Sequence, residues 1–174
     1  ETGGRTLLVV SPLTRTIQTA ALLFHNFADH AIHVVLEPSV VEALNAPHDI
    51  VENIGRDMAV VFEEAAMMLQ DYGAPMSAQR LLQRLQEASA CLENEWWFQA
   101  ARQGELPHRV LESGAQERRA RIRSAVAEHV AAVPGGVDRV FIVAHWGVLY
   151  TLTENKGAKN LECVTLPAFL EQDA

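Results

Sequence analysis

From Leu7 to Ala20 the chain reads LLVVSPLTRTIQTA, an apolar run that passes through Ser-Pro into a segment with helical spacing. The run predicts a buried strand over Thr6 to Val10. Ser11 is a typical N-cap residue and Pro12 a typical first helical residue, so we expect a helix from Pro12 to about Phe24. A strand followed at once by a helix indicates an α/β fold.

Arg15 falls in the first turn of this expected helix. Unpaired backbone N–H groups and the helix dipole already make that end positive, so a fixed cation is unfavourable there unless an anion binds. A helix start combined with a guanidinium group is suited to hold a phosphate. The alternative is an Arg15 side chain that simply extends into solvent.

A second apolar run, RVFIVA from Arg139 to Ala144, lies near the other end of the chain and stops at His145-Trp146-Gly147. It predicts a central parallel strand. Ligands of open α/β sheets bind at the carboxyl ends of strands, and both Arg15 and His145 follow such ends. We therefore expect the two side chains to converge on one site, whereas His145 beside Trp146, taken alone, favours a packing role.

The other segments complete the α/β pattern within one domain, residues 1–174. Ile32 to Leu36 predicts a second, edge-like strand, and a short final strand is expected after Glu162. A mostly helical insert and a further helix are expected between the strand Ile32 to Leu36 and the strand Arg139 to Ala144, at residues 56–72, 77–94 and 112–133. The last of these helices has Ile122, Val126 and Val130 on one face, and its arginines predict a solvated opposite face: Arg118, Arg119, Arg121 and Arg123. The expected architecture is an open, mainly parallel sheet flanked by helices.

Together, these stretches resemble the histidine phosphatase superfamily, also called phosphoglycerate mutase-like, whose members carry a strand followed by SPLxRxxQTA and a later strand that ends in an HGG-like turn. Here the two motifs are Ser11 to Ala20 and His145-Trp146-Gly147. The resemblance is greatest to the fungal and plant branch and extends to Pro38–Glu42, Pro47–Asp49, Trp96–Trp97, Leu152–Glu154 and Asn160–Glu162. It implies a phosphoglycerate mutase-like fold and a phosphomonoester hydrolase that acts through a phosphohistidine, without metal or cofactor.

The same resemblance implies a role for each site residue. Arg15 and His145 would bind the phosphoryl group together with the backbone N–H of Trp146, whose indole either narrows the pocket or packs outward. Glu42 would protonate the leaving oxygen, which requires a raised carboxyl pKa near neutrality. Its apolar neighbours Val40, Val41, Ala43 and Leu44 would supply the desolvation. Asp49 and Glu52 remain alternative acids.

The phosphate-accepting histidine is the missing part of this resemblance. Family members open with a strand that carries Arg-His-Gly, and no Arg-His-Gly occurs in these 174 residues. We expect that motif in an N-terminal segment outside this chain, so that the domain is incomplete at its N-terminus. The alternative is a catalytically inactive pseudophosphatase that serves as a phosphate-binding or interaction domain. A nucleotide-binding module is a weaker option, because no glycine-rich loop follows the first strand.

Composition restricts the partners. The net charge of -8 disfavours nucleic acid and anionic membrane, both of which require clustered Lys and Arg. The expected partner is a phosphorylated small molecule or a phosphate ion. Cys91 and Cys163 have no metal-ligand spacing and predict buried free thiols, and the three histidines His25, His30 and His33 share no face that would bind a metal. No signal peptide or membrane-spanning segment is visible, which leaves localisation open with a cytoplasmic one favoured.

Overall fold

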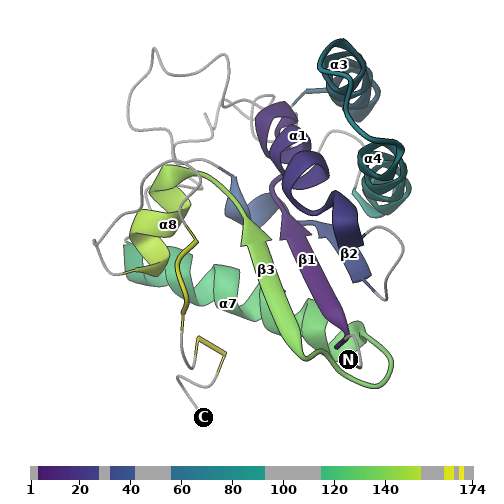
Figure 1. Ribbon diagram of the computed structural model, residues 1–174. Helices are drawn as coiled ribbons and strands as arrows, with labels where there is room; N and C mark the ends of the chain where they lie inside the picture. The colour runs from purple at the N-terminus through teal and green to yellow at the C-terminus, as the bar shows by residue number, and fades with distance from the viewer. Residues whose placement is uncertain are drawn as a thin grey trace, which may run out of the picture.

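The fold is built around a three-stranded parallel sheet with helices on both faces (Figure 1). The computed structural model describes residues 4–27, 32–41, 56–92, 115–153, 163–166 and 169–170. The strands are β1 (Thr6–Val10), β2 (Ile32–Leu36) and β3 (Arg139–Val143), in the order β2-β1-β3. The α/β class and the parallel pairing are as the sequence predicts, and so are the bounds of β1 and β2.

The described helices are α1 (Thr14–Leu23), α3 (Met58–Asp71), α4 (Met76–Ala88), α7 (Ala115–Ala132) and α8 (Trp146–Leu152). Four of the described helices lie next to the sheet, and α3 packs on α1 and α4. Single 3-10 turns occupy His25–Phe27, Pro38–Val40 and Ser89–Cys91. α3 and α4 form the helical insert that the sequence predicts between the outer strands. None of the described helices is long and apolar enough to cross a membrane.

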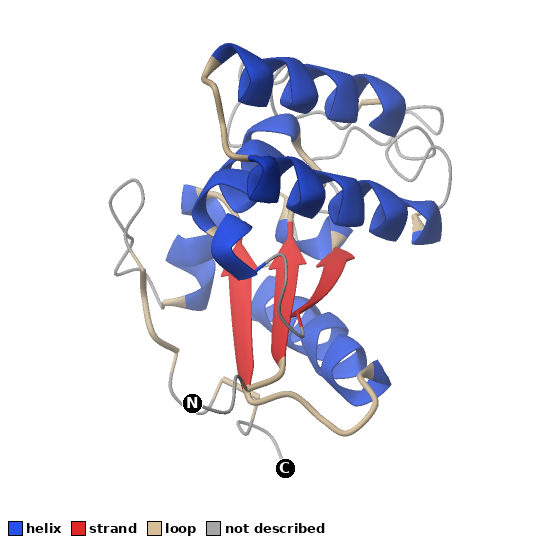
Figure 2. Ribbon diagram, turned by 45° about the vertical axis from the view of Figure 1, so that its right-hand side comes forward, coloured by secondary structure: helices blue, strands red, loops and turns tan. Residues whose placement is uncertain are grey.

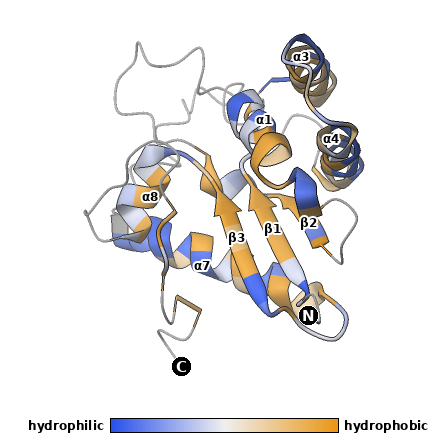
Figure 3. Ribbon diagram, in the orientation of Figure 1, coloured by the Kyte–Doolittle hydropathy of each residue, from blue (hydrophilic) through white to orange (hydrophobic). Residues whose placement is uncertain are grey.

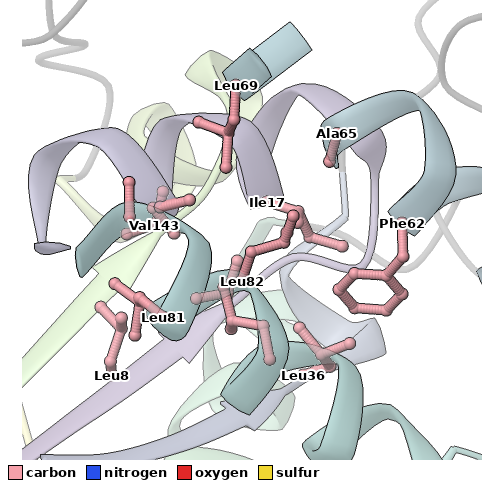
Figure 4. Close-up of a cluster of buried hydrophobic side chains, with 14 of the residues drawn as sticks. Leu8, Ile17, Leu36, Phe62, Ala65, Leu69, Leu81, Leu82 and Val143 are labelled. Atoms are coloured by element: carbon pink, nitrogen blue, oxygen red, sulfur yellow. The ribbon is translucent and has the colours of Figure 1, made fainter. Parts of the chain in front are cut away.

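β1 is central, and all five of its residues are buried. Its side chains alternate between two cores, as strand geometry requires. Leu8 and Val10 join the core under α1, α3 and α4 (Figure 4), whereas Leu7 and Val9 join the core against α7 and α8. Helices on both sides of the strands are visible in Figure 2, and the apolar colouring of the strands in Figure 3 marks the sheet as the middle layer.

β3 is an edge strand in the described part of the chain, not the central strand that its apolar run predicts. Its apolar residues are explained by two covered faces. Phe141 packs on Phe24, with ring centroids 5.1 Å apart, while Ile142 packs against the core under α7. An apolar run thus indicates that both faces of a strand are buried. It does not show whether the strand pairs along one edge or along both edges.

The ends of the helices follow from local chemistry. Asp57 caps α3 by accepting a hydrogen bond from the Ala59 N–H at 2.8 Å, and the chain turns after α3 at Gly73, where φ is +61°. Gly135 and Gly136 also have positive φ and form the turn from α7 into β3. The expected final strand is absent from residues 163–166, which are described and have no regular structure.

Candidate functional site

The candidate site lies where β1 and β3 end side by side. The backbone N–H of Ser11 donates to the carbonyl of Val143 at 3.0 Å, which continues the parallel pairing one residue past β1. The two following segments therefore leave the sheet at the same edge, α1 after β1 and α8 after β3. This is the edge at which open α/β sheets bind ligands.

His145 is the centre of a hydrogen-bond network at this edge, in which His145 and Ser11 are buried and Arg15 is exposed. Its ring lies between Ser11 and Arg15, 134 and 130 residues away in the chain, with Nε2 3.0 Å from Ser11 Oγ and Nδ1 3.0 Å from Arg15 Nε. The side chain is only 6% exposed. The sequence prediction that Arg15 and His145 converge is thus confirmed, and Ser11 is a third member of the network.

The Arg15 contact determines which nitrogen of His145 carries the proton. A guanidinium group only donates, so Nδ1 accepts from the Arg15 Nε–H and is unprotonated. The neutral ring then holds its proton on Nε2 and donates it to Ser11 Oγ. The Ser11 hydroxyl, which accepts this bond, retains its own proton for donation to another acceptor.

The surroundings of His145 strongly favour the neutral ring. Burial, followed by the positive charges of Arg15 and Arg118, lowers the pKa of His145 from 6.5 to about 3. Protonation would also place a hydrogen on Nδ1, against the Arg15 N–H that it now accepts. At neutral pH His145 is therefore an uncharged group that orients Arg15.

α1 starts later than the Ser-Pro signal predicts, and Ser11 is not its N-cap. The helix begins at Thr14 after Leu13, which provides no side-chain cap. The Ser11 hydroxyl is occupied by His145, and the Thr16 hydroxyl instead donates to the Leu13 carbonyl at 2.7 Å. The prediction for Arg15 holds, since it is the second residue of the helix and its first turn contains no acidic residue.

Trp146 follows His145 and packs outward. Its side chain is 52% exposed, and its ring stacks on Tyr150 with centroids 4.9 Å apart and planes 21° apart. Of the two orientations that the sequence left open, the outward one is found, so the indole does not fill the space around His145. The role of its backbone N–H in phosphate binding stays a prediction.

The candidate acid Glu42 and its alternatives Asp49 and Glu52 lie outside the described residues, as does the Trp96–Trp97 pair. Val41, directly before Glu42, is the last described residue of this segment. It follows the 3-10 turn after β2, on the side of the sheet where all three strands end (Figure 1).

A small cavity of about 180 Å³ adjoins Arg15 on the first turn of α1. The cavity lies between α1 and the start of α3, and Arg56 is among its lining residues. Arg56 forms an ion pair with Glu64, with Nη1 2.6 Å from Oε1. Thr14 Oγ1 donates to the other oxygen of Glu64 at 3.3 Å. Arg15 thus contacts both His145 and this cavity, whereas His145 does not line it. The lining residues are Leu13, Thr14, Arg15, Gln18, Arg56, Val61 and Glu64.

Arg118 is the site residue that the sequence interpretation missed. The prediction of a solvated arginine face is wrong for Arg118, which is 5% exposed and donates through Nη2 to the carbonyl of Val41. It is also wrong for Arg123, which lies over the ring of Phe169 at 5.8 Å. The sequence pattern could have predicted that Arg118 is buried. Ile122 and Val126 are four residues apart on the buried face of α7, and the same spacing one turn earlier gives position 118.

Neither thiol is buried as the sequence predicts: Cys91 and Cys163 are both free and exposed. Cys91 ends a 3-10 turn, and Cys163 lies in a segment without regular structure, so neither is on a core-facing side of an element. Among the described residues no cluster of His, Cys, Asp or Glu side chains has the arrangement of a metal site. His25 contacts Ser77 Oγ at 2.9 Å, His33 is exposed, and His30 lies outside the described residues.

Comparison with known proteins yields no relative: no protein-family model, no curated protein and no solved structure matches this chain.

Proposed function

We propose that this domain is of the phosphoglycerate mutase-like type and binds the phosphoryl group of a phosphomonoester at the carboxyl ends of β1 and β3, as part of a histidine phosphatase. The observation that carries the proposal is the Ser11–His145–Arg15 network. It joins the two motifs on which the sequence resemblance rests, although they are 130 residues apart. It also fixes a guanidinium group at the first turn of a helix, where an anion offsets the positive helix end.

In this proposal the chain supplies charge and orientation. Phosphoryl transfer requires that the equatorial oxygens be stabilised and that the attacking and leaving atoms lie in line. Arg15 provides the charge, and the neutral His145 orients its guanidinium group by accepting a hydrogen bond from Nε at 3.0 Å. The accepting histidine is assigned to a segment outside these 174 residues, and Glu42 to the proton donor.

The pseudophosphatase alternative shares this binding site and differs only in the acceptor. The alternative rests on the absence of Arg-His-Gly from these 174 residues, and a Trp146 indole that narrowed the pocket would give it further weight. Trp146 packs on Tyr150 instead, 52% exposed, so the indole no longer favours the alternative.

Calorimetric titration with inorganic phosphate and with vanadate tests the binding site. The 174-residue chain should bind both, and Arg15→Met should weaken binding by about 10- to 100-fold, the cost of one charge-assisted bond. Arg139→Met is the matched control, because exposed Arg139 begins β3 at the opposite end of the sheet. The chain alone should leave p-nitrophenyl phosphate unhydrolysed. Unchanged phosphate affinity in Arg15→Met would refute the proposed site.

A further inference from the structure

Arg118 occupies a position in α7 that an apolar residue would normally fill. It lies four residues before Ile122 and eight before Val126, and all three side chains are buried. The guanidinium group stays charged at any physiological pH, and burying a charge costs several kcal/mol unless hydrogen bonds and opposite charge offset it. An arginine at such a position is therefore held by polar contacts and not by apolar packing alone.

The contacts of Arg118 direct it toward the candidate site. Its Nη2 donates to the backbone carbonyl of Val41, the residue directly before Glu42 in the chain. Its positive charge is also one of the causes that lower the pKa of His145, after burial and Arg15. Arg15 reaches the same ring from α1, which lies on the other face of the sheet from α7 (Figure 1). Two fixed positive charges, one from each helical layer, thus lie around one neutral histidine.

We infer that Arg118 is a positioning residue of the phosphate site, which adds a second positive charge to the site and anchors the backbone at Val41, directly after the 3-10 turn that follows β2. The inference rests on the proposed function. Arg118 acts on the bound anion through the field at the site and through the backbone that it holds, without itself being assigned a contact with the phosphate.

The variants separate charge from structure. Arg118→Met removes the charge and keeps much of the apolar stem, whereas Arg118→Lys keeps the charge and loses the planar fork. Arg121→Met is the matched control, since Arg121 lies on the same helix and is exposed. Circular dichroism shows whether each variant is folded. If Arg118→Met is unfolded, the test is made with Arg118→Lys.

Two measurements are made on each variant: phosphate affinity by calorimetry, and the titration of the His145 ring by NMR. Arg118→Met should weaken phosphate binding on the order of tenfold. It should also move the midpoint of the His145 titration upward from about 3, part of the way toward 6.5. Arg118→Lys should leave that midpoint low while binding phosphate less tightly than the original chain, because the Val41 contact is altered. Arg121→Met should change neither.

The outcomes distinguish this inference from the proposed function. If the original chain binds no phosphate, the proposed function is refuted and the inference falls with it. If the original chain binds phosphate and Arg118→Met binds it equally well, with an unmoved His145 midpoint, the inference alone is overturned. If Arg118→Met does not fold, a folded Arg118→Lys with full phosphate affinity overturns it.

Discussion

Acid should destabilise this fold in part through one buried side chain, His145. The pKa of its ring is about 3 in the folded chain and 6.5 when the ring is free in water. Between these two values the unfolded chain binds a proton that the folded chain does not. Stability is therefore lost as the pH falls below 6.5, at about 1.4 kcal/mol for each pH unit.

The magnitude follows directly from that slope. From about pH 7.5 to about pH 5 the loss assigned to His145 is about 2 kcal/mol, and it approaches about 5 kcal/mol once the pH is below 3. A loss of about 2 kcal/mol is a large fraction of the free energy of unfolding of a typical domain, which is about 5–15 kcal/mol. The conversion is appropriate because the side chain is 6% exposed, so solvent screens it little.

Urea denaturation at the two pH values measures this loss. Because acid acts on the whole chain, the informative quantity is the difference in acid sensitivity between the original chain and His145→Gln. That variant should be less stable at neutral pH but should lose about 2 kcal/mol less on acidification. His33→Gln is the control, because His33 is exposed and its replacement should leave the pH dependence unchanged. Equal acid sensitivity of His145→Gln and the original chain would refute the reasoning.

Two further predictions concern the scaffold. Leu81→Ala should cost about 2–5 kcal/mol in urea denaturation, because Leu81 is fully buried between α4 and the sheet, whereas Leu23→Ala, at a half-exposed position, should change stability by less than about 0.5 kcal/mol. Gly135→Ala should lower the thermal midpoint, because φ is +80° and the new Cβ would meet the Arg5 guanidinium; Gly73→Ala, with φ at +61° and no atom near its Cβ, should lower it less.

The positions of β1 and β2 were predictable because each strand is a short stretch of apolar or β-branched residues. β1 is buried on both faces, so its pattern is a continuous apolar run, and β2 is rich in β-branched residues; both bounds agree with the structure. The helices of the insert were predictable from their spacing, and α3 ends as expected next to Gly73. These elements are determined by residues close to one another in sequence, which is why local patterns suffice.

The missed features depend on contacts between distant segments. Ser11 has the right chemistry for an N-cap, yet its hydroxyl bonds to His145, 134 residues away, and the helix begins three residues later at Thr14. β3 has the composition of a central strand but lies at an edge of the described sheet. Arg118 falls on a helix rich in arginine, and only the packing of α7 against the sheet and Val41 shows that this one is buried.

The candidate site and the acid sensitivity have the same physical origin. Burial, together with the charges of Arg15 and Arg118, keeps the His145 ring neutral, so the ring adds no third positive charge beside the two arginines. An oxyanion beside Arg15 would attract both guanidinium groups and would favour the protonated ring, which at present is disfavoured by both. Linkage between the two equilibria is reciprocal. If a bound anion raises the pKa of His145, protonation of His145 strengthens anion binding by the corresponding free energy. The positive charges that disfavour protonation of His145 in the free chain would thus also favour binding of an oxyanion, so that acid sensitivity and anion binding are coupled through one side chain.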